Sequence, residues 1–162
     1  MKRTILVLAV VKICALGCAT GGDGASSLAR NKALVERTHK EVWSRGDMAA
    51  ADEIYARDFL AHWTGGPDTV GIESFKSFVA EGRGRTSNYE ETVEQIVAEG
   101  DLVVTRFVSK CTVASEPGEP SKYKEVTMRE IAIHRIRDGK IVEQWSVEGQ
   151  LDERPVDAVP PP

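Results

Sequence analysis

Residues 131–145 read IAIHRIRDGKIVEQW, and this stretch decides the fold. Apolar and polar residues alternate on both sides of Asp138-Gly139, which is the period of a half-buried strand. Asp-Gly between two such runs predicts a two-residue type I′ hairpin turn. In a regular ladder this turn places His134 opposite Glu143, Ala132 opposite Trp145, and Arg129 opposite Glu148. His134 and Trp145 then share one face, and Ser146 and Glu148 share the other.

The rest of the chain divides into a helical half and a strand half. Apolar residues recur at helical spacing in the first half, and alternation takes over in the second. Ser27 and Asp47 are suitable N-caps, and Gly46 is a suitable C-cap. We expect helices over 28–45, 48–55 and 72–81, then strands over 92–98, 102–114, 123–137 and 141–147. The order predicts an α+β fold, with N-terminal helices packed on a curved antiparallel sheet that encloses an apolar pocket.

The first residues predict export. Lys2 and Arg3 precede an apolar run, which indicates a signal peptide over 1–17. Ala15-Leu16-Gly17-Cys18 resembles a bacterial lipobox, which implies lipid attachment at Cys18 and a periplasm-facing protein in the cell envelope. Ala19, which follows the cysteine, favours the outer membrane in a Gram-negative cell. The alternative is a plain cleaved signal ending near Ala19. We interpret 18–27 as a flexible tether, 28–151 as one domain, and 152–162 as a disordered Pro-rich tail.

Charge and cysteine content exclude several classes of protein. The chain of 162 residues has a net charge of −4, and loss of Lys2, Arg3 and Lys12 with the signal makes it −7. An acidic protein is a poor nucleic-acid binder, because phosphate neutralisation needs a surplus of Lys and Arg. Three cysteines make no disulfide framework, and no Cys/His cluster has the spacing of a zinc site.

Several segments together resemble the SnoaL-like polyketide cyclases of the nuclear-transport-factor-2-like fold. They are the hairpin 131–145, Trp43-Ser44-Arg45-Gly46-Asp47, residues 55–62 (YARDFLAH), Gly71-Ile72-Glu73-Ser74-Phe75 and Glu99-Gly100-Asp101-Leu102-Val103. The resemblance covers residues 28–151 and implies a cone-shaped fold. It also implies an intramolecular aldol-type reaction with no metal and no cofactor. Such chemistry needs a base, donors for the enolate and a dry pocket.

The candidate catalytic residues are Glu148, His62 and His134, and the candidate substrate-binding residues are Trp63, Arg106 and Trp145. The resemblance places His62 in the pocket, and the alternative is a loop histidine at its rim. His134 faces Glu143 in the predicted register, so it could equally form a surface ion pair. His39 lies on the charged side of the first helix, where we expect it to be solvated.

The cyclases carry an essential Asp shortly after the tryptophan that matches Trp145. Here Glu148 is the only acid in the segment 145–151. In a regular ladder it lies opposite Arg129, on the face away from His134. Either a bulge brings Glu148 into the pocket, or the catalytic carboxylate is lost.

Two functions follow. One is a cofactor-free enzyme acting on a small apolar carbonyl compound. The other is a non-catalytic pocket protein that binds an apolar small molecule or a partner. Analogy with such folds also suggests a homodimer through the outer sheet face.

Overall fold

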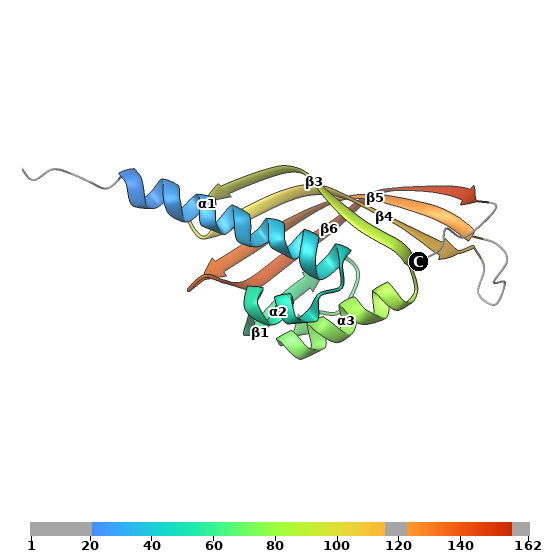
Figure 1. Ribbon diagram of the computed structural model, residues 1–162, viewed down its shortest axis with the longest axis horizontal. Helices are drawn as coiled ribbons and strands as arrows, with labels where there is room; N and C mark the ends of the chain where they lie inside the picture. The colour runs from blue at the N-terminus through green and yellow to red at the C-terminus, as the bar shows by residue number, and fades with distance from the viewer. Residues whose placement is uncertain (1–20, 116–122, 157–162) are drawn as a thin grey trace, which may run out of the picture.

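The computed structural model describes residues 21–115 and 123–156 (Figure 1). The predicted signal peptide, Cys18 and the end of the tail lie outside these residues. The helical elements are α1 (Gly21–Arg37), the π-helix η1 (Thr38–Ser44), α2 (Met48–Ile54) and α3 (Ile72–Gly84). The strands are β1 (Tyr55–Trp63), β2 (Thr69–Val70), β3 (Ser87–Glu99), β4 (Leu102–Ala114), β5 (Tyr123–Arg137) and β6 (Lys140–Val156).

The strands form one six-stranded sheet in the order β2-β1-β6-β5-β4-β3. Neighbours from β3 to β6 pair antiparallel, as the sequence predicts. The curved sheet packed against helices is confirmed, with one addition: β1 pairs parallel with β6, so the sheet is mixed. From the sequence we expect a helix over 48–55 and no strand over 55–63. Tyr55, Phe59 and Ala61 are buried and lie an even number of residues apart, which is the period of a strand.

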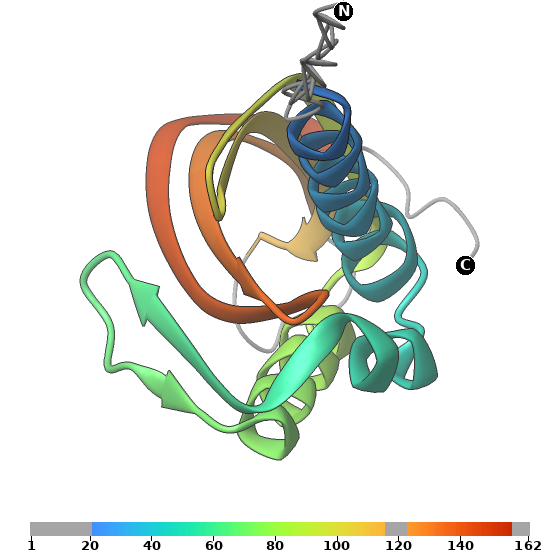
Figure 2. The same cartoon turned by 90° about the vertical axis from the view of Figure 1, so that its left-hand side faces the viewer.

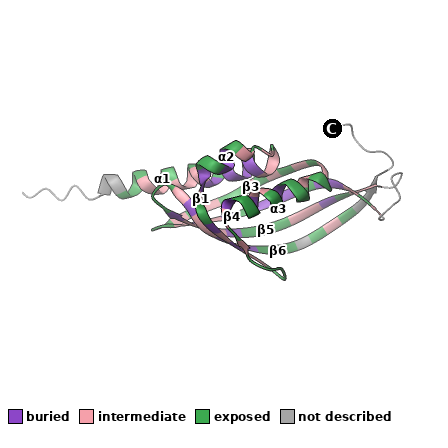
Figure 3. Ribbon diagram, turned by 90° about the horizontal axis from the view of Figure 1, so that it is seen from below, coloured by how far each residue is buried: buried purple, intermediate pink, exposed green. Residues whose placement is uncertain are grey.

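The sheet curls into a shell, and the helices close its open side (Figure 2). Val35 and Val42 of the first helical stripe are fully buried against residues of the sheet and of α3, including Val103 and Phe75. Buried residues line the inner side of this arrangement, and the opposite sides of the helices are exposed (Figure 3). The core therefore fills one end of the cone and leaves the other end for a cavity.

Local signals set the helix boundaries that frame the cavity. Oδ1 of Asp47 accepts hydrogen bonds from the backbone N–H groups of Ala49 and Ala50, each at 3.0 Å, which caps α2 as predicted. Gly46 has φ of +73°, the left-handed conformation expected of a residue that ends a helix. The first helix begins at Gly21 rather than at Leu28, so residues 21–27 are helical and not the flexible tether that we expected.

The last strand is longer than the sequence predicts. Residues 152–156 were assigned to the disordered tail, yet β6 continues to Val156 and pairs with β5. Pro155 is opposite Lys124 at the end of this ladder. The β5–β6 ladder resumes beyond Gly149 and continues from Leu151 to Val156, so a single proline near its end does not stop pairing. No helix among the described residues is long and apolar enough to cross a membrane.

Candidate functional site

The β5–β6 hairpin contains an extra residue that changes which side chains face inward. Asp138 and Gly139 have φ of +53° and +73°, and Arg137 pairs with Lys140, so the type I′ turn is confirmed. The prediction of a regular ladder beyond this turn is wrong. Ile136 pairs with Ile141, but Arg135 pairs with Glu143, so Val142 is an unpaired bulge residue.

The bulge at Val142 reverses the predicted faces of the hairpin. His134 is opposite Gln144, and Glu130 is opposite Glu148. His134 therefore shares its face with Ser146 and Glu148, whereas Trp145 is opposite Ile133 on the other face. Arg129 does not pair with Glu148; its Nη1 lies 2.9 Å from Oδ2 of Asp152. A bulge thus brings Glu148 to the face of His134. This bulge lies at Val142, before Trp145 in the chain.

This inner face borders a cavity of about 160 Å³ between the helices and the sheet. Aromatic side chains form much of its wall, and polar groups gather on β5 and β6. The lining residues are His39, Trp43, Trp63, Thr64, Phe78, Tyr89, Glu91, Phe107, Met128, Glu130, Ala132, His134, Gln144, Ser146 and Glu148. Glu148 is exposed at the mouth, whereas His134 and Gln144 are buried.

His39 forms a buried hydrogen bond with Glu91 that was not predicted from the sequence. The expectation that His39 is solvated is wrong, because it is only 3 % exposed. Its Nδ1 lies 2.6 Å from Oε2 of Glu91, and its Nε2 lies 3.2 Å from Oγ1 of Thr105. The hydroxyl of Tyr89 donates to the other oxygen of Glu91 at 2.7 Å. His39 follows Val35 by four residues and precedes Val42 by three, so its spacing belongs to the buried stripe.

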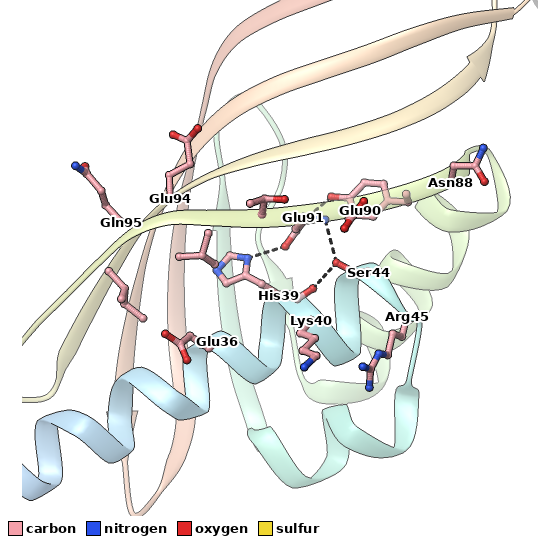
Figure 4. Close-up of a pocket in the computed structure, with 14 residues that line it drawn as sticks. Glu36, His39, Lys40, Ser44, Arg45, Asn88, Glu90, Glu91, Glu94 and Gln95 are labelled. Carbon is pink, nitrogen blue, oxygen red and sulfur yellow. Dashed lines mark hydrogen bonds and ion pairs between the residues drawn. The ribbon is translucent and has the colours of Figure 1, made fainter. Parts of the chain in front are cut away.

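The π-helix η1 places His39 and Trp43 at the cavity wall. Ser44 ties the end of this helix to β3: its hydroxyl donates to the carbonyl oxygen of His39 at 2.7 Å and accepts from the N–H of Glu91 at 2.9 Å. On the outer side of this contact lies an open groove of about 820 Å³ between η1 and β3 (Figure 4). His39, Tyr89 and Glu91 line both spaces and form the wall between them.

Glu130 is a second interior carboxyl group that was not selected from the sequence. Its Oε1 accepts a hydrogen bond from the hydroxyl of Ser109 at 2.6 Å. Burial, reinforced by the nearby charges of Glu91 and Glu148, raises the pKa of Glu130 to about 7. The alternation of β5 places Glu130 on the same face as His134, so this alternation alone could have revealed it.

Two buried polar atoms of the cavity lining, on residues that lie opposite each other in the β5–β6 ladder, have no hydrogen-bond partner among the described residues. They are Nδ1 of His134 and Oε1 of Gln144. The amide nitrogen of Gln144 is occupied, because it donates to Oγ of Ser146 at 2.8 Å. Burial, together with the nearby charge of His39, lowers the pKa of His134 to about 3, so its ring is neutral at physiological pH. Unpaired buried polar atoms are costly and mark a place where a ligand can bind.

The structure places three of the predicted site residues away from this cavity. His62 stacks on Trp145 at 5.5 Å between ring centroids, and both lie on the outer face. Its ring nitrogens lie 3.2 Å from Glu143 and 3.0 Å from Asp68; the hydrogen bond to Glu143 is the main cause of its raised pKa. Arg106 lies 2.6 Å from Glu94 on the outer surface. Of the predicted residues, Glu148, His134 and Trp63 line the cavity, and His62, Arg106 and Trp145 do not.

Among the residues that the structure describes, no group of three or more His, Cys, Asp or Glu side chains gathers as metal ligands would. The polar groups of the cavity are instead carboxylates, imidazoles, an amide and hydroxyls. These groups can abstract and donate protons and can hold a polar atom of a ligand.

The curved sheet, the closing helices and the cavity with polar groups on its last two strands define a cone-shaped α+β protein of the nuclear-transport-factor-2-like type. Residues 33–153 match the family described as SnoaL-like polyketide cyclase. The chain therefore belongs to the SnoaL-like family. No curated protein matches the sequence at a significant level.

Solved structures support the same fold. A candidate SnoaL-like polyketide cyclase from Jannaschia sp. CCS1 is 23% identical with a TM-score of 0.64, over 75% of this chain and 86% of that one. IdmH, a candidate polyketide cyclase from Streptomyces antibioticus, is 26% identical with a TM-score of 0.61, over 73% and 91%. An LEH-like epoxide hydrolase from M. tuberculosis is 16% identical with a TM-score of 0.63, over 76% and 85%. Different activities therefore occur on this fold, and the function has to be argued from the cavity.

Proposed function

We propose that the protein is a cofactor-free enzyme that acts on a small apolar carbonyl compound by acid/base chemistry. The observation that carries the proposal is the register of the β5–β6 hairpin. Because of the bulge at Val142, Glu148 and His134 share the inner face and line the same cavity. A base and a hydrogen-bond donor on one apolar cavity are what the abstraction of a proton beside a carbonyl group requires.

In this proposal Glu148 is the base and His134 is the donor. The carboxylate of Glu148 takes a proton from the carbon next to the carbonyl group, and the electron pair moves to the carbonyl oxygen. The free Nδ1 of His134, protonated in the appropriate tautomer, donates a hydrogen bond to that oxygen. Trp63 and the other aromatic residues of the wall keep water away from the enolate.

Deuterium exchange tests the proton-abstraction step directly, whatever product the enzyme forms. The protein is incubated in D₂O with 2-indanone and 2-tetralone, and NMR follows the loss of the protons beside the carbonyl group. The wild type should accelerate exchange, and Glu148→Gln should lower the rate by about 10²–10⁴-fold, since the amide keeps the shape but cannot take the proton. Glu143→Gln is the matched control, because Glu143 is on the same strand and contacts His62 on the outer face.

Other outcomes overturn parts of the proposal. If Glu130→Gln abolishes exchange and Glu148→Gln does not, the base is Glu130. If the ketones bind to wild type and Glu148→Gln alike and neither protein accelerates exchange, the enzyme proposal is wrong. A non-catalytic protein that binds a small molecule would then account for the cavity.

We also propose that the protein is exported and lipid-anchored through Cys18, on the sequence of its first 18 residues. Cys18→Ser should move the protein from the membrane fraction to the soluble fraction and abolish labelling by a fatty-acid analogue. A wild-type protein that is soluble and begins after Cys18 would contradict the anchor.

The outer sheet face supports the further proposal of a homodimer. Val97, Ile131 and Val147 are 60 %, 44 % and 56 % exposed, and the ladders between β3 and β6 bring them to one face. Apolar side chains gathered on one exposed face are typical of an interface. Sedimentation should give the mass of a dimer, and Val147→Lys should give that of a monomer. A monomeric wild type would contradict this proposal.

A further inference from the structure

The hydroxyl group of Ser146 lies at the cavity and has no role in the proton abstraction proposed above. Ser146 is on the inner face of β6, is 8 % exposed and lines the cavity. Its Oγ accepts a hydrogen bond from the amide nitrogen of Gln144 at 2.8 Å. A hydroxyl group has one proton to donate and two lone pairs with which to accept. The contact with Gln144 therefore occupies a lone pair of Ser146 and leaves its O–H group free to donate.

The proton of this hydroxyl group has no acceptor among the residues that the structure describes. The contact from Gln144 accounts for the hydrogen bonding of the Ser146 side chain within 21–115 and 123–156. Because the amide holds the oxygen atom from one side, the O–H bond is directed away from Gln144. A buried donor without a partner is costly, so the acceptor is expected to come from the molecule that fills the cavity.

The backbone holds Ser146 in place from two sides. Ser146 pairs with Ala132 of β5 and with Trp63 of β1. The hydroxyl group of Thr64 also donates to the backbone carbonyl oxygen of Ser146 at 2.8 Å. A hydrogen-bond donor on so fixed a backbone does not have to reorganise when charge develops on a substrate, which is the property that stabilises a transition state.

Ser146 is also the closest polar neighbour of the proposed base along β6. Residues two apart on a strand share a face and are separated by about 6–7 Å, so Ser146 and Glu148 are consecutive inward-facing residues. His134 is opposite Gln144, which is one step further from Glu148 along the ladder. In a ketone, only two bonds separate the carbonyl oxygen from the carbon that loses its proton. A donor at Ser146 and a base at Glu148 are therefore suitably spaced for the two ends of this unit.

We propose that Ser146 is a catalytic residue that donates a hydrogen bond to the carbonyl oxygen of the substrate, and that Gln144 is the residue that positions it. As Glu148 takes the proton, the electron pair of the C–H bond forms the carbon–carbon double bond, and the carbonyl π electrons move to oxygen. The O–H bond of Ser146 stays intact, and its hydrogen bond strengthens as that oxygen becomes negative. The inference rests on the proposed function, because it takes this cavity as the substrate site.

Deuterium exchange of 2-indanone measures the contribution of Ser146. Ser146→Ala should lower kcat for exchange by about 10²-fold and change KM little, because the lost hydrogen bond is strongest in the transition state. Ser77→Ala is the matched control, since the hydroxyl group of Ser77 donates to the backbone of Glu73 on the exposed side of α3. Its kcat should equal that of the wild type. A wild-type kcat in Ser146→Ala would overturn the inference and would mean that the hydroxyl proton points to Gln144 rather than to the substrate.

A double-mutant cycle tests whether Gln144 acts through Ser146. Gln144→Met removes the amide and keeps a side chain of similar length, so the hydroxyl group of Ser146 loses its orientation. Exchange should fall by about tenfold in the wild-type background and should not fall further in Ser146→Ala. An equal loss in both backgrounds would show that Gln144 acts independently of Ser146, and the positioning role would be wrong.

The infrared band of the ketone carbonyl group provides a measurement that needs no turnover. A hydrogen bond to the carbonyl oxygen polarises the C=O bond, so the band of 2-indanone should move to lower wavenumber on binding to the wild type and to Ser77→Ala. The shift should be smaller in Ser146→Ala. An unshifted band in the wild type, or the same shift in Ser146→Ala, would overturn the inference.

These results separate a failure of the inference from a failure of the proposed function. Exchange that requires Glu148 but proceeds at the wild-type rate in Ser146→Ala would refute the role of Ser146 and leave the enzyme proposal intact. A band shift that depends on Ser146 in a protein without exchange would support the hydrogen bond to the carbonyl oxygen and contradict the enzyme proposal.

Discussion

The imidazole of His39 and the carboxylate of Glu91 meet at 2.6 Å in the wall between the cavity and the groove. Their side chains are 4 % and 3 % exposed, so the pair is shielded from water. It joins η1 to β3, and Tyr89 and Thr105 complete its hydrogen bonds. The pair therefore holds the helix that carries Trp43 against the sheet.

Removal of one partner should destabilise the fold strongly. Glu91→Ala leaves the imidazole of His39 without its carboxylate, and breaking a buried pair costs about 3–5 kcal/mol. Urea unfolding followed by tryptophan fluorescence measures the loss. Glu90→Ala removes an exposed carboxylate from the next position and should change stability by less than about 0.5 kcal/mol. The double variant His39→Leu/Glu91→Leu should be more stable than Glu91→Ala; equal urea midpoints for Glu91→Ala and wild type would refute the structural role of the pair.

Glu130 should make the stability of the protein fall as the pH rises. Its folded pKa of about 7 lies above the ordinary value of 4.5, so the folded state holds the proton more tightly than the unfolded state. The stability that this group contributes is complete below about pH 4.5 and is lost as the pH increases to about 7. The loss is about 3 kcal/mol, since one pKa unit corresponds to about 1.4 kcal/mol and the two pKa values differ by about 2.5.

Urea unfolding of wild type and Glu130→Gln between pH 4.5 and pH 8 measures this effect. The variant should become more stable relative to the wild type as the pH rises, because glutamine has no proton to lose. Glu125→Gln, an exposed position on the same strand, is the control and should keep the wild-type dependence. If the free energy of unfolding depends on pH in the same way for wild type and Glu130→Gln, the carboxyl group of Glu130 has the same pKa in the folded and unfolded states.

Gly149 should tolerate no side chain. A Cβ atom at this position would lie well inside contact distance of the carbonyl oxygen of Arg129, where a second irregularity interrupts the β5–β6 ladder. Gly149→Ala forces the two strands apart and should destabilise the protein by about 1–3 kcal/mol, as overpacking does. Gly82→Ala in α3 is the control, because a Cβ there meets nothing within 4 Å. A melting temperature of Gly149→Ala equal to that of the control would disprove the close contact.

The hairpin turn should depend on Gly139. Its φ of +73° is a conformation that a β-branched residue adopts only with strain. Gly139→Val should therefore lower the free energy of unfolding by about 1–3 kcal/mol. Asp138→Asn keeps a residue pair typical of a type I′ turn and should be nearly neutral. If both variants have the melting temperature of the wild type, the identity of the residues at positions 138 and 139 does not contribute to the stability of the protein.

Local signals in the sequence predicted most of the framework. The Asp138-Gly139 turn, the cap at Asp47 and the strands over 102–114 and 123–137 depend on neighbouring residues, and the structure has all of them. The parallel pairing of β1 with β6 joins segments far apart in the chain, so no short pattern predicts it.

The candidate site was harder to predict, because one unpaired residue, Val142, decides which side chains of β6 face the cavity. Glu148, His134 and Trp63 were selected and lie at the cavity. The bulge at Val142 has no marker in the sequence such as glycine, so the regular register placed Glu148 on the wrong face. His39 was misjudged because its polarity was given more weight than its place between Val35 and Val42 in the helix.

The single extra residue at Val142 also decides which side chains of β6 this protein presents to its cavity. A strand presents its side chains in two alternating sets, and a regular pairing of Val142 with β5, without the bulge, would exchange the two sets beyond it. Trp145 and Val147 would then face the interior, and Ser146 and Glu148 would face solvent. The same amino acids would then leave Glu91 and Glu130 in the cavity but turn Glu148 outward, so a shift of register, without any substitution, is enough to remove the proposed base.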